Sequence, residues 1–298
     1  MKNTFLAIFF IAFSISNYAQ ETSTTFNDQE FLAYLENLSE NKEAASETKK
    51  EFRQKSWAYW SANKIDYNQS PEKYKKALSL YHLNQEKFNN DRVIALDRFK
   101  KAIENFKSFD SRNTLPKNPV LFVGSSSIVH WETAKAFPEF PVINRGFGGA
   151  SIPEIIYYYD DVIKKHTPAI LVIYSDIDVE AGKSPSVAVA AYDELLTKVK
   201  KDFPETEVLL LAMKPTLIDD FLGKEVAKNK IRTNELLSEY CATEEHMKFV
   251  DVSTPMLKPD DAVRSDIFLE DGLHMNPLGY TLWNPILKKE IGELMKTK

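Results

Sequence analysis

Near the carboxyl terminus, an aspartate and a histidine stand three residues apart in the segment Asp271-Gly272-Leu273-His274. At that spacing a carboxylate can hydrogen-bond the imidazole Nδ1 and leave Nε2 free to act as a base. A serine hydroxyl, which is a poor nucleophile at its own pKa, needs such a base and a partner that orients it. The same residues would also suit a polar helix entry, so the pair alone leaves both interpretations open.

A serine that this base could serve lies in Gly124-Ser125-Ser126-Ser127-Ile128, directly after a short apolar run. The glycine permits a tight turn, and the serines stand where a helix is expected to begin. Free N–H groups and the positive end of the helix dipole favour negative charge that develops there. Glycine and serine at a strand-to-helix turn also cap helices or bind phosphate, so this segment alone does not distinguish these roles.

A glycine-rich segment, NRGFGGAS at residues 144–151, follows the next apolar run. Its glycines let backbone N–H groups approach a bound oxygen, although as a lone feature the segment is a turn. A serine loop, a glycine loop and an Asp-x-x-His turn together supply a nucleophile, oxyanion donors and a base. The three segments therefore predict catalysis by a nucleophilic serine.

The composition excludes several classes of protein. The 298 residues are 43% hydrophobic and 12% aromatic, which suits one enzyme-sized domain with a smaller accessory part. The net charge is -5, and the 38 basic and 43 acidic residues are interspersed, so we expect no nucleic-acid partner. The oligomeric state stays open.

The metal-binding residue types are few and show no ligand spacing. There are 5 histidines and 1 cysteine, and we expect no metal and no other cofactor. Cys241 lies in a helical pattern and is expected to fill the core rather than to act as a nucleophile. His130 and His166 are expected to be surface or packing residues.

The three segments must be positioned by strands and helices that alternate from residue 116 onward. Short apolar runs lie at 120–123, 141–144, 169–174, 207–212 and 248–252, with helical stretches at 152–165, 185–201 and 224–242 between them. This alternation predicts a parallel sheet with helices on both faces. We expect a flavodoxin-like three-layer α/β/α sandwich over residues 116–298, with reactive groups at the carboxyl ends of the strands.

The preceding residues 20–115 predict a helical region. Apolar residues from Phe31 to Phe106 recur at helical spacing, without the fixed period of a repeat array. Trp57 and Trp60 could line a sugar-binding surface, but aromatics three apart on an amphipathic helix favour the core. The region either braces one edge of the sandwich or lies over its site.

Residues 1–19 predict a signal peptide. A lysine at position 2 precedes an apolar run from Thr4 to Ile15, and Ala19 supplies a small residue before cleavage. The run is shorter than the roughly 20 residues that span a bilayer, so we expect no permanent membrane span after cleavage. We therefore expect an exported protein, periplasmic or extracellular.

Residues 95 to 298 resemble the SGNH/GDSL hydrolases, in particular members related to platelet-activating-factor acetylhydrolase with a Gly-Ser-Ser-Ser first block. The segment VLFVGSSSI looks like that first block. The alignment implies that Ser126 is the nucleophile and that Ser125 takes the position of the family's aspartate. The resemblance also implies the SGNH hydrolase form of the α/β sandwich.

Two further blocks carry the resemblance. NRGFGGAS is similar to the second block, which implies that the N–H group of Gly149, with Gly148 as the alternative, helps to hold the oxyanion. DGLHMNPLGY is similar to the fifth block, which implies Asp271 and His274 as the remaining catalytic pair.

The third block departs from the family pattern. The family has Gly-x-Asn-Asp there, whereas this chain has YSDID at residues 174–178. If Asp178 matches the final aspartate, Ile177 stands where the side-chain oxyanion donor should be, and losing such a donor typically costs about 10²- to 10³-fold in rate. An ionised Asp176 would repel an oxyanion, so activity requires it to point away, to be neutral or to pair with a cation such as Arg145.

The resemblance implies an exported serine esterase. His274 takes the proton from Ser126, which attacks an ester carbonyl, and the N–H groups of Ser126 and Gly149 hold the oxyanion. Acetyl or other short acyl esters on carbohydrate are the expected substrates, with a small soluble ester or a lysophospholipid as the alternative. A second hypothesis is a catalytically silent member that binds a glycan or a protein partner. A third, a phosphate- or nucleotide-binding flavodoxin-like protein, leaves the Asp-x-x-His turn unexplained.

Overall fold

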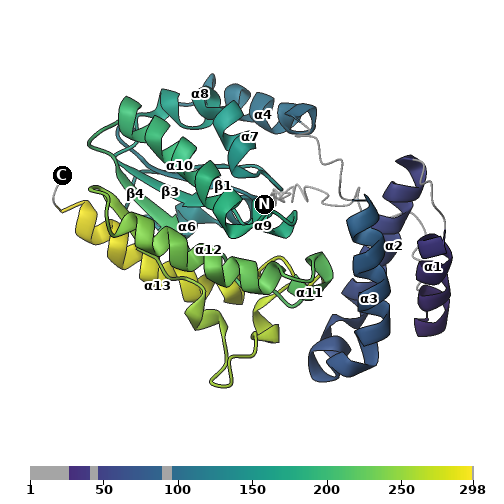
Figure 1. Ribbon diagram of the computed structural model, residues 1–298. Helices are drawn as coiled ribbons and strands as arrows, with labels where there is room; N and C mark the ends of the chain where they lie inside the picture. The colour runs from purple at the N-terminus through teal and green to yellow at the C-terminus, as the bar shows by residue number, and fades with distance from the viewer. Residues whose placement is uncertain (1–26, 41–45, 89–95, 297–298) are drawn as a thin grey trace, which may run out of the picture.

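Five parallel strands form one sheet at the centre of the structure (Figure 1). They are β1 (Val120–Gly124), β2 (Val142–Gly146), β3 (Ile170–Tyr174), β4 (Glu207–Leu211) and β5 (Met247–Val250), in the spatial order β2-β1-β3-β4-β5. The computed structural model describes residues 27–40, 46–88 and 96–296, and the predicted signal peptide at residues 1–19 lies outside them. The strand order is that of a flavodoxin-like sheet.

The side chains of the strands alternate between two apolar layers. In β1, Val120 and Phe122 belong to one hydrophobic cluster, whereas Leu121 and Val123 belong to the other. Every residue of β1 and β3 is buried, as expected for central strands of a parallel sheet that is covered on both faces. This double burial explains why the strands appear in the sequence as continuous apolar runs.

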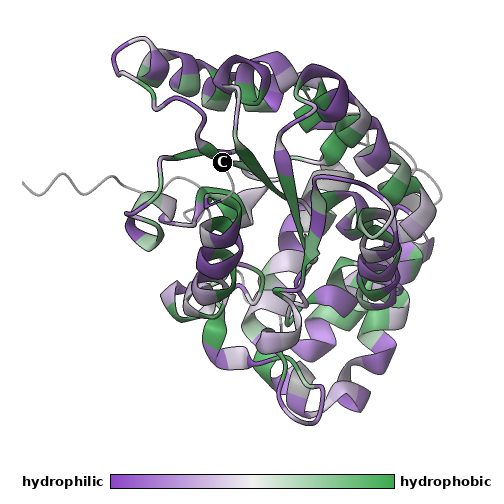
Figure 2. Cartoon of the chain, turned by 90° about the vertical axis from the view of Figure 1, so that its left-hand side faces the viewer, coloured by the Kyte–Doolittle hydropathy of each residue, from purple (hydrophilic) through white to green (hydrophobic). Residues whose placement is uncertain are grey.

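Helices cover both faces of the sheet. One face carries α6 (Thr133–Ala136) and α13 (Pro277–Leu294), and the other carries α7 (Ile152–Tyr157), α8 (Tyr159–Val162), α10 (Pro185–Asp202) and α12 (Val226–Cys241). Figure 2 shows the green, apolar strands between helices that are partly green and partly purple. The predicted three-layer α/β/α sandwich is therefore confirmed.

The observed helices follow the predicted ones with one interruption. The stretch predicted at 152–165 is divided at Tyr158 into α7 and α8 and ends in the 3-10 helix η3 (Lys164–His166). Cys241 is a free, buried thiol at the end of α12, and burial raises its pKa to about 11, so it fills the core as predicted. In the part of the chain that is described, none of the helices is long and apolar enough to cross a membrane.

Three helices precede the sandwich, namely α1 (Asp28–Glu40), α2 (Ser46–Gln69) and α3 (Pro71–Phe88). Their facing sides form an aromatic cluster in which the rings of Phe31 and Tyr59 stack with centroids 3.9 Å apart. Trp60 is buried in this cluster, and Trp57 packs against Phe221 of the sandwich with centroids 5.6 Å apart. Trp60 is therefore a core residue, and Trp57 packs at the junction between α2 and the sandwich.

A fourth helix of the predicted helical region packs with the sandwich instead. The 3-10 helix η2 (Leu96–Phe99) leads into α4 (Lys100–Asp110), and Phe99 and Ile103 join the cluster that contains Phe147 of the loop after β2. Figure 1 shows α4 beside α7 and α8, apart from α1, α2 and α3. The division at residue 115 stays a prediction, and by packing α4 belongs to the layered part of the chain.

One histidine is buried beneath the face of the sheet that α4 covers. His166, at the end of η3, is 5% exposed and lies near Arg145, Lys165 and Asp110. Burial lowers the pKa of His166, as do the charges of Arg145 and Lys165, whereas Asp110 raises it. The net pKa is about 4. His166 is thus a packing residue, one of the two roles expected for it, and it is neutral at pH 7.

This burial predicts a loss of stability in mild acid. The pKa of His166 is about 4 in the folded chain and about 6.5 in the unfolded chain, so below pH 6.5 the unfolded state binds the extra proton and the folded state loses stability until the pH reaches 4. At pH 5 the loss is about 2 kcal/mol. Urea unfolding at pH 7.5 and pH 5 should show a smaller difference for His166→Gln than for the wild type. Equal differences would contradict a buried neutral imidazole.

Candidate active site

The serine loop begins where the end of β1 lies against the backbone of β3. Gly124 ends β1 with φ +155°, and a Cβ atom there would lie 1.9 Å from the carbonyl oxygen of Tyr174 in β3, so only glycine fits. The N–H of Ser125 donates to the same carbonyl at 3.1 Å. Ser126 then begins α5 (Ser126–Val129), which confirms that this serine stands at a helix entrance.

The turn at residues 271–274 holds its carboxylate and imidazole in direct contact. Asp271 Oδ2 lies 2.6 Å from His274 Nδ1, and Asp271 Oδ1 accepts the backbone N–H groups of Leu273 and His274 at 2.9 Å each. Burial raises the pKa of Asp271, but these hydrogen bonds outweigh it and lower that pKa to about 2. The ionised carboxylate therefore orients the imidazole, with Nε2 on the opposite side of the ring.

The fold brings this turn beside the serine helix. The N–H of His130 donates to Ser126 O at 3.0 Å, and the ring of His130 meets the ring of His274 edge-on with centroids 5.1 Å apart. Tyr280 of α13 donates its hydroxyl to Ser127 O at 2.8 Å, although the two residues are 153 positions apart. Asp271, His274 and the helix that Ser126 begins are therefore in contact through His130.

The contact of His130 with His274 was not predicted from the sequence. Burial lowers the pKa of His130, the neighbouring His274 lowers it further, and Asp271 raises it. The only available signal was its position one helical turn after Ser126, which places both residues on the same side of a helix.

The glycine loop is held from two sides. Asp178 Oδ2 accepts the N–H of Ile152 at 3.0 Å, and the hydroxyl of Ser175 donates to Ala150 O at 2.8 Å. Both acceptor and donor come from the third block, so Asp178 and Ser175 fix the backbone where the glycine loop leads into α7. Gly148 is exposed, and Gly149 has φ +78°, in the left-handed region that favours glycine.

Arg98 supplies a further contact to the glycine loop that the sequence did not indicate. Its guanidinium donates to Gly149 O and occupies the space that a Cβ atom at Gly149 would need, 2.8 Å from Nη2. The guanidinium also lies over the ring of Phe99, 4.3 Å from the centroid. Arg98 belongs to η2, 51 positions before Gly149, so this contact depends on how η2 packs on the loop.

Asp176 does not face the serine loop as a lone charge. It is buried, accepts the hydroxyl of Tyr174 at 2.5 Å, and lies 3.3 Å from Lys214 Nζ and 3.8 Å from Lys230 Nζ. Burial raises the pKa of Asp176, but the two lysines and the tyrosine outweigh it and hold that pKa well below its usual range. Asp176 is therefore ionised and paired.

Arg145, the example given of a cation that could pair with Asp176, does not lie beside it. Arg145 points to the opposite face of the sheet, where its buried guanidinium pairs with Asp110 of α4 and lies over the ring of Phe106, 5.1 Å from the centroid. Side chains alternate along a strand, so Arg145 in β2 faces α4 whereas its neighbours Asn144 and Gly146 face the serine helix. Arg145 supports the fold and does not line the site.

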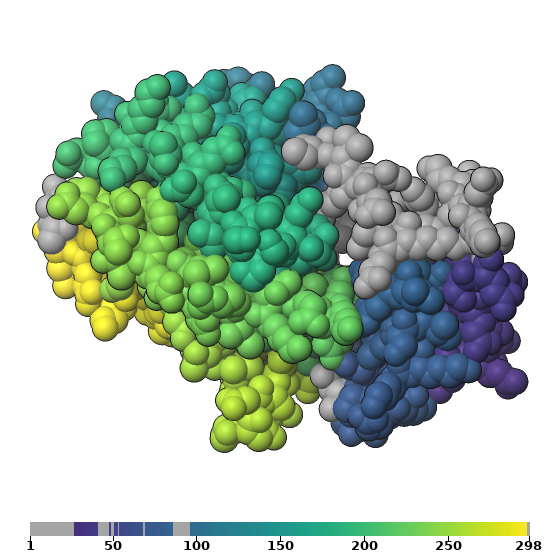
Figure 3. Space-filling view, viewed as in Figure 1, coloured from purple at the N-terminus to yellow at the C-terminus, as the bar shows by residue number. Residues whose placement is uncertain are grey.

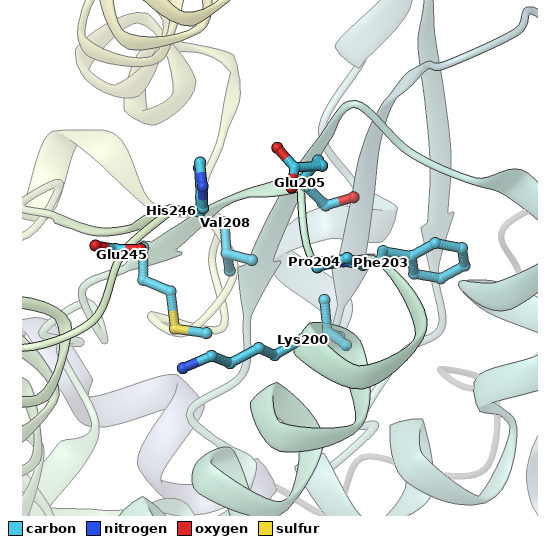
Figure 4. Close-up of a pocket in the computed structure, with 10 residues that line it drawn as sticks. Lys200, Phe203, Pro204, Glu205, Val208, Glu245 and His246 are labelled. Atoms are coloured by element: carbon cyan, nitrogen blue, oxygen red, sulfur yellow. The ribbon is translucent and has the colours of Figure 1, made fainter.

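A pocket elsewhere on the molecule is unrelated to these residues (Figure 4). Lys200, Phe203, Glu205 and His246 are among the residues that line it, at the amino ends of β4 and β5. The predicted catalytic segments all follow the carboxyl ends of strands, whereas this pocket lies at the amino ends of the strands. In the described ranges, no group of three or more His, Cys, Asp or Glu residues is arranged to hold a metal ion.

Comparison with known proteins identifies the family. The sequence model of the GDSL-like lipase/acylhydrolase family matches residues 125–282, which is more than half of the chain. The chain belongs to this family. The predicted SGNH/GDSL resemblance is thereby confirmed, and at the family level the protein is a carboxylic ester hydrolase. Helices α1 to α4 lie outside the matched residues.

Solved structures show the same fold. A Streptococcus pneumonia protein described as a platelet activating factor has 18% identity and a TM-score of 0.60, with 65% of this chain and 93% of that chain covered. A Bacteroides fragilis protein described as an acylhydrolase has 18% identity and a TM-score of 0.54, with 68% and 99% covered. A GDSL-like lipase from Bacteroides thetaiotaomicron has 16% identity and a TM-score of 0.53, with 64% and 97% covered. Among curated protein sequences there is no significant match.

The ring contact between the two histidines predicts a measurable coupling. His274→Gln removes one of the causes that lower the pKa of His130, so the pKa of His130 should rise toward its ordinary value. Imidazole nitrogen NMR across a pH titration measures this pKa in both proteins. His246→Gln, at the far edge of the sheet, serves as the control and should leave His130 unchanged. An unaltered pKa in His274→Gln would show that the rings do not interact in solution.

Proposed function

We propose that the protein is an exported serine esterase that hydrolyses acetyl or other short acyl esters on carbohydrate or on another small alcohol. The observation that carries the proposal is the ionised Asp271, which is held by two backbone N–H groups and bonded to His274 Nδ1 beside the helix that Ser126 begins. This arrangement supplies a base with a fixed tautomer next to a hydroxyl at a helix entrance. Export rests on the signal peptide predicted at residues 1–19.

The mechanism has two halves. His274 Nε2 takes the proton of Ser126 Oγ as the oxygen attacks the ester carbonyl, and the N–H groups of Ser126 and Gly149 hold the oxyanion. The intermediate collapses to an acyl-serine, and His274 returns the proton to the leaving alcohol. His274 then takes a proton from a water molecule as the water oxygen attacks the acyl carbonyl. It passes that proton to Ser126 Oγ as the acyl–oxygen bond breaks and the carboxylic acid leaves.

The third block supports the oxyanion loop indirectly. Its Asp178 fixes the N–H of Ile152, and Arg98 fixes the carbonyl of Gly149, so the backbone between them is held from both ends. A fixed N–H donor needs no reorganisation when the oxyanion forms, which is the basis of its effect on rate. The paired charge of Asp176 removes the repulsion expected of a free carboxylate.

Hydrolysis of p-nitrophenyl acetate and butyrate by the mature chain tests the proposal. Ser126→Ala and His274→Ala should each lower kcat by at least about 10³-fold, because members of a catalytic triad act as a unit. Ser238→Ala, near the end of α12, and His246→Ala, next to the amino end of β5, change the same residue types at the opposite end of the strands and should retain turnover. If all five proteins turn over these esters equally slowly while folded, the esterase proposal fails for these substrates.

A catalytically silent protein that binds a glycan or a protein partner is the second candidate. Ile177 favours it: if Asp178 matches the final aspartate of the third block, Ile177, at the start of α9 (Ile177–Glu180), stands at the family's side-chain oxyanion donor position. A fluorophosphonate separates the two candidates, because it labels only an activated serine. Labelling at Ser126 that is lost in His274→Ala supports the esterase, whereas an unreactive Ser126 supports the silent protein.

The altered third block gives a gain-of-activity prediction. Ile177→Asn restores the amide of the family pattern, and one oxyanion donor is worth about 10²- to 10³-fold in rate, so kcat for p-nitrophenyl acetate should rise at least about tenfold. Ile177→Leu keeps the apolar character and should leave kcat unchanged. A kcat for Ile177→Asn at or below that of the wild type would show that this position does not reach the oxyanion.

A further inference from the structure

The catalytic turn packs directly on a helix that lies outside the family-matched residues. Gly272, between the predicted catalytic aspartate and histidine, has φ +69°, and a Cβ atom there would lie 2.7 Å from Lys64 Cδ of α2. Leu217 and Ile218 close the same space, each with a side-chain carbon at 3.2 Å. The backbone of the turn is therefore packed between α2 and the loop after β4, and a Cβ atom at Gly272 would displace the Lys64 side chain.

Lys64 is held across the turn by its own helix. Its side chain is 9% exposed, although lysine is seldom buried, and its Nζ donates to Ser61 O at 2.6 Å. This bond bends the side chain back along α2 and lays its methylene groups over Gly272. The methylene groups are therefore the part of Lys64 that contacts the catalytic turn.

A second connection runs through the loop after β4. The N–H of Leu217 donates to Gly272 O at 3.0 Å, and the loop continues into α11 (Asp219–Leu222). Helix α3 contacts two backbone carbonyl groups of α11. His82 Nε2 lies 2.7 Å from Asp220 O, and Gln85 donates to Leu222 O at 2.6 Å.

Helix α11 also packs against the aromatic cluster of α1, α2 and α3, through Phe221. The ring of Phe221 lies between Trp57, Trp60 and Tyr81, with centroids 5.6, 5.9 and 4.9 Å away. Figure 1 shows α11 beside α3, and Figure 3 shows the blue helices in contact with the green surface of the sandwich. The helices thus hold α11, and through it the loop that contacts the catalytic turn.

The other end of α11 is anchored in the sandwich. Asp219 Oδ1 lies 2.8 Å from Lys230 Nζ, which also lies 2.8 Å from Glu180 Oε1, and all three side chains are nearly inaccessible. Because α11 is anchored on this side, its contacts with α2 and α3 connect these helices to the buried part of the sandwich.

From these contacts we infer that helices α1, α2 and α3 position the Asp271–His274 turn, with Lys64 as the positioning residue and Phe221 as the second point of support. The inference rests on the proposed function of that turn. A displacement of about 1 Å in a catalytic group can cost about 10²-fold in rate, so a brace on the turn controls kcat without contact with the substrate. The helical region is then a working part of the enzyme.

The test compares two substitutions at Lys64 in the full mature chain. Lys64→Ala removes the methylene groups over Gly272 and should lower kcat for p-nitrophenyl acetate at least tenfold, with KM changed less than twofold. Lys64→Met keeps most of the stem without the charge and should retain kcat within about threefold. Ile65→Ala, at the exposed neighbouring position of α2, is the control and should match the wild type.

A spectroscopic readout separates this inference from the proposed function. The Nδ1 proton of His274, in its bond to Asp271, should give a low-field proton resonance that is sharp in the wild type and in Lys64→Met and broadened or lost in Lys64→Ala. If the wild type hydrolyses no ester but Lys64→Ala still loses the resonance, the positioning role stands and the proposed function fails. Unchanged kcat and an unchanged resonance in folded Lys64→Ala would overturn the inference.

A second variant tests the other support. Phe221→Leu loosens α11 within the aromatic cluster and should broaden the same resonance and lower kcat, by less than Lys64→Ala does. It also keeps the inference testable if Lys64→Ala does not fold. If folded Phe221→Leu has the same resonance and the same kcat as the wild type, α11 does not support the catalytic turn.

Discussion

The close approach of β1 and β3 at Gly124 is the constraint on which the site depends. The two backbones are so near that a Cβ atom would lie 1.9 Å from Tyr174 O, and this contact fixes where the chain leaves the sheet. The serine helix begins there, with the loops after β2 and β3 on its two sides. The order of the strands also places the point of divergence between β1 and β3, where ligands bind in open α/β sheets.

The third block contributes to a buried ionic cluster. Asp176 joins Lys214 and Lys230 in a buried ionic cluster that also includes Glu180. Burial and the charge of Asp176 raise the pKa of Glu180, and the two lysines only partly oppose this shift. Removing one partner of a buried ion pair typically costs about 3–5 kcal/mol, because the other charge is left uncompensated. This cluster therefore ties α9, α11 and α12 together beneath the site.

Elements outside the family-matched residues complete the surroundings of the site. Arg98 precedes the sandwich in sequence and binds Gly149 O, and Lys64 of α2 covers Gly272. One stabilises the loop proposed to hold the oxyanion, and the other supports the turn proposed to supply the base. The fold shared with distant relatives thus positions the glycine loop and the Asp271–His274 turn. The helices outside the family-matched residues pack against both segments.

The sequence by itself determined the layers, the strands to within a few residues and the bond between Asp271 and His274. Each of these depends on local spacing: apolar runs mark buried strands, and three residues separate a carboxylate from an imidazole in one turn. The partners of Arg145, Asp176 and Lys64 were decided only by the tertiary structure. Those contacts join segments far apart in the chain, and the side of a strand or helix that meets a given neighbour is set by packing, which no local pattern contains.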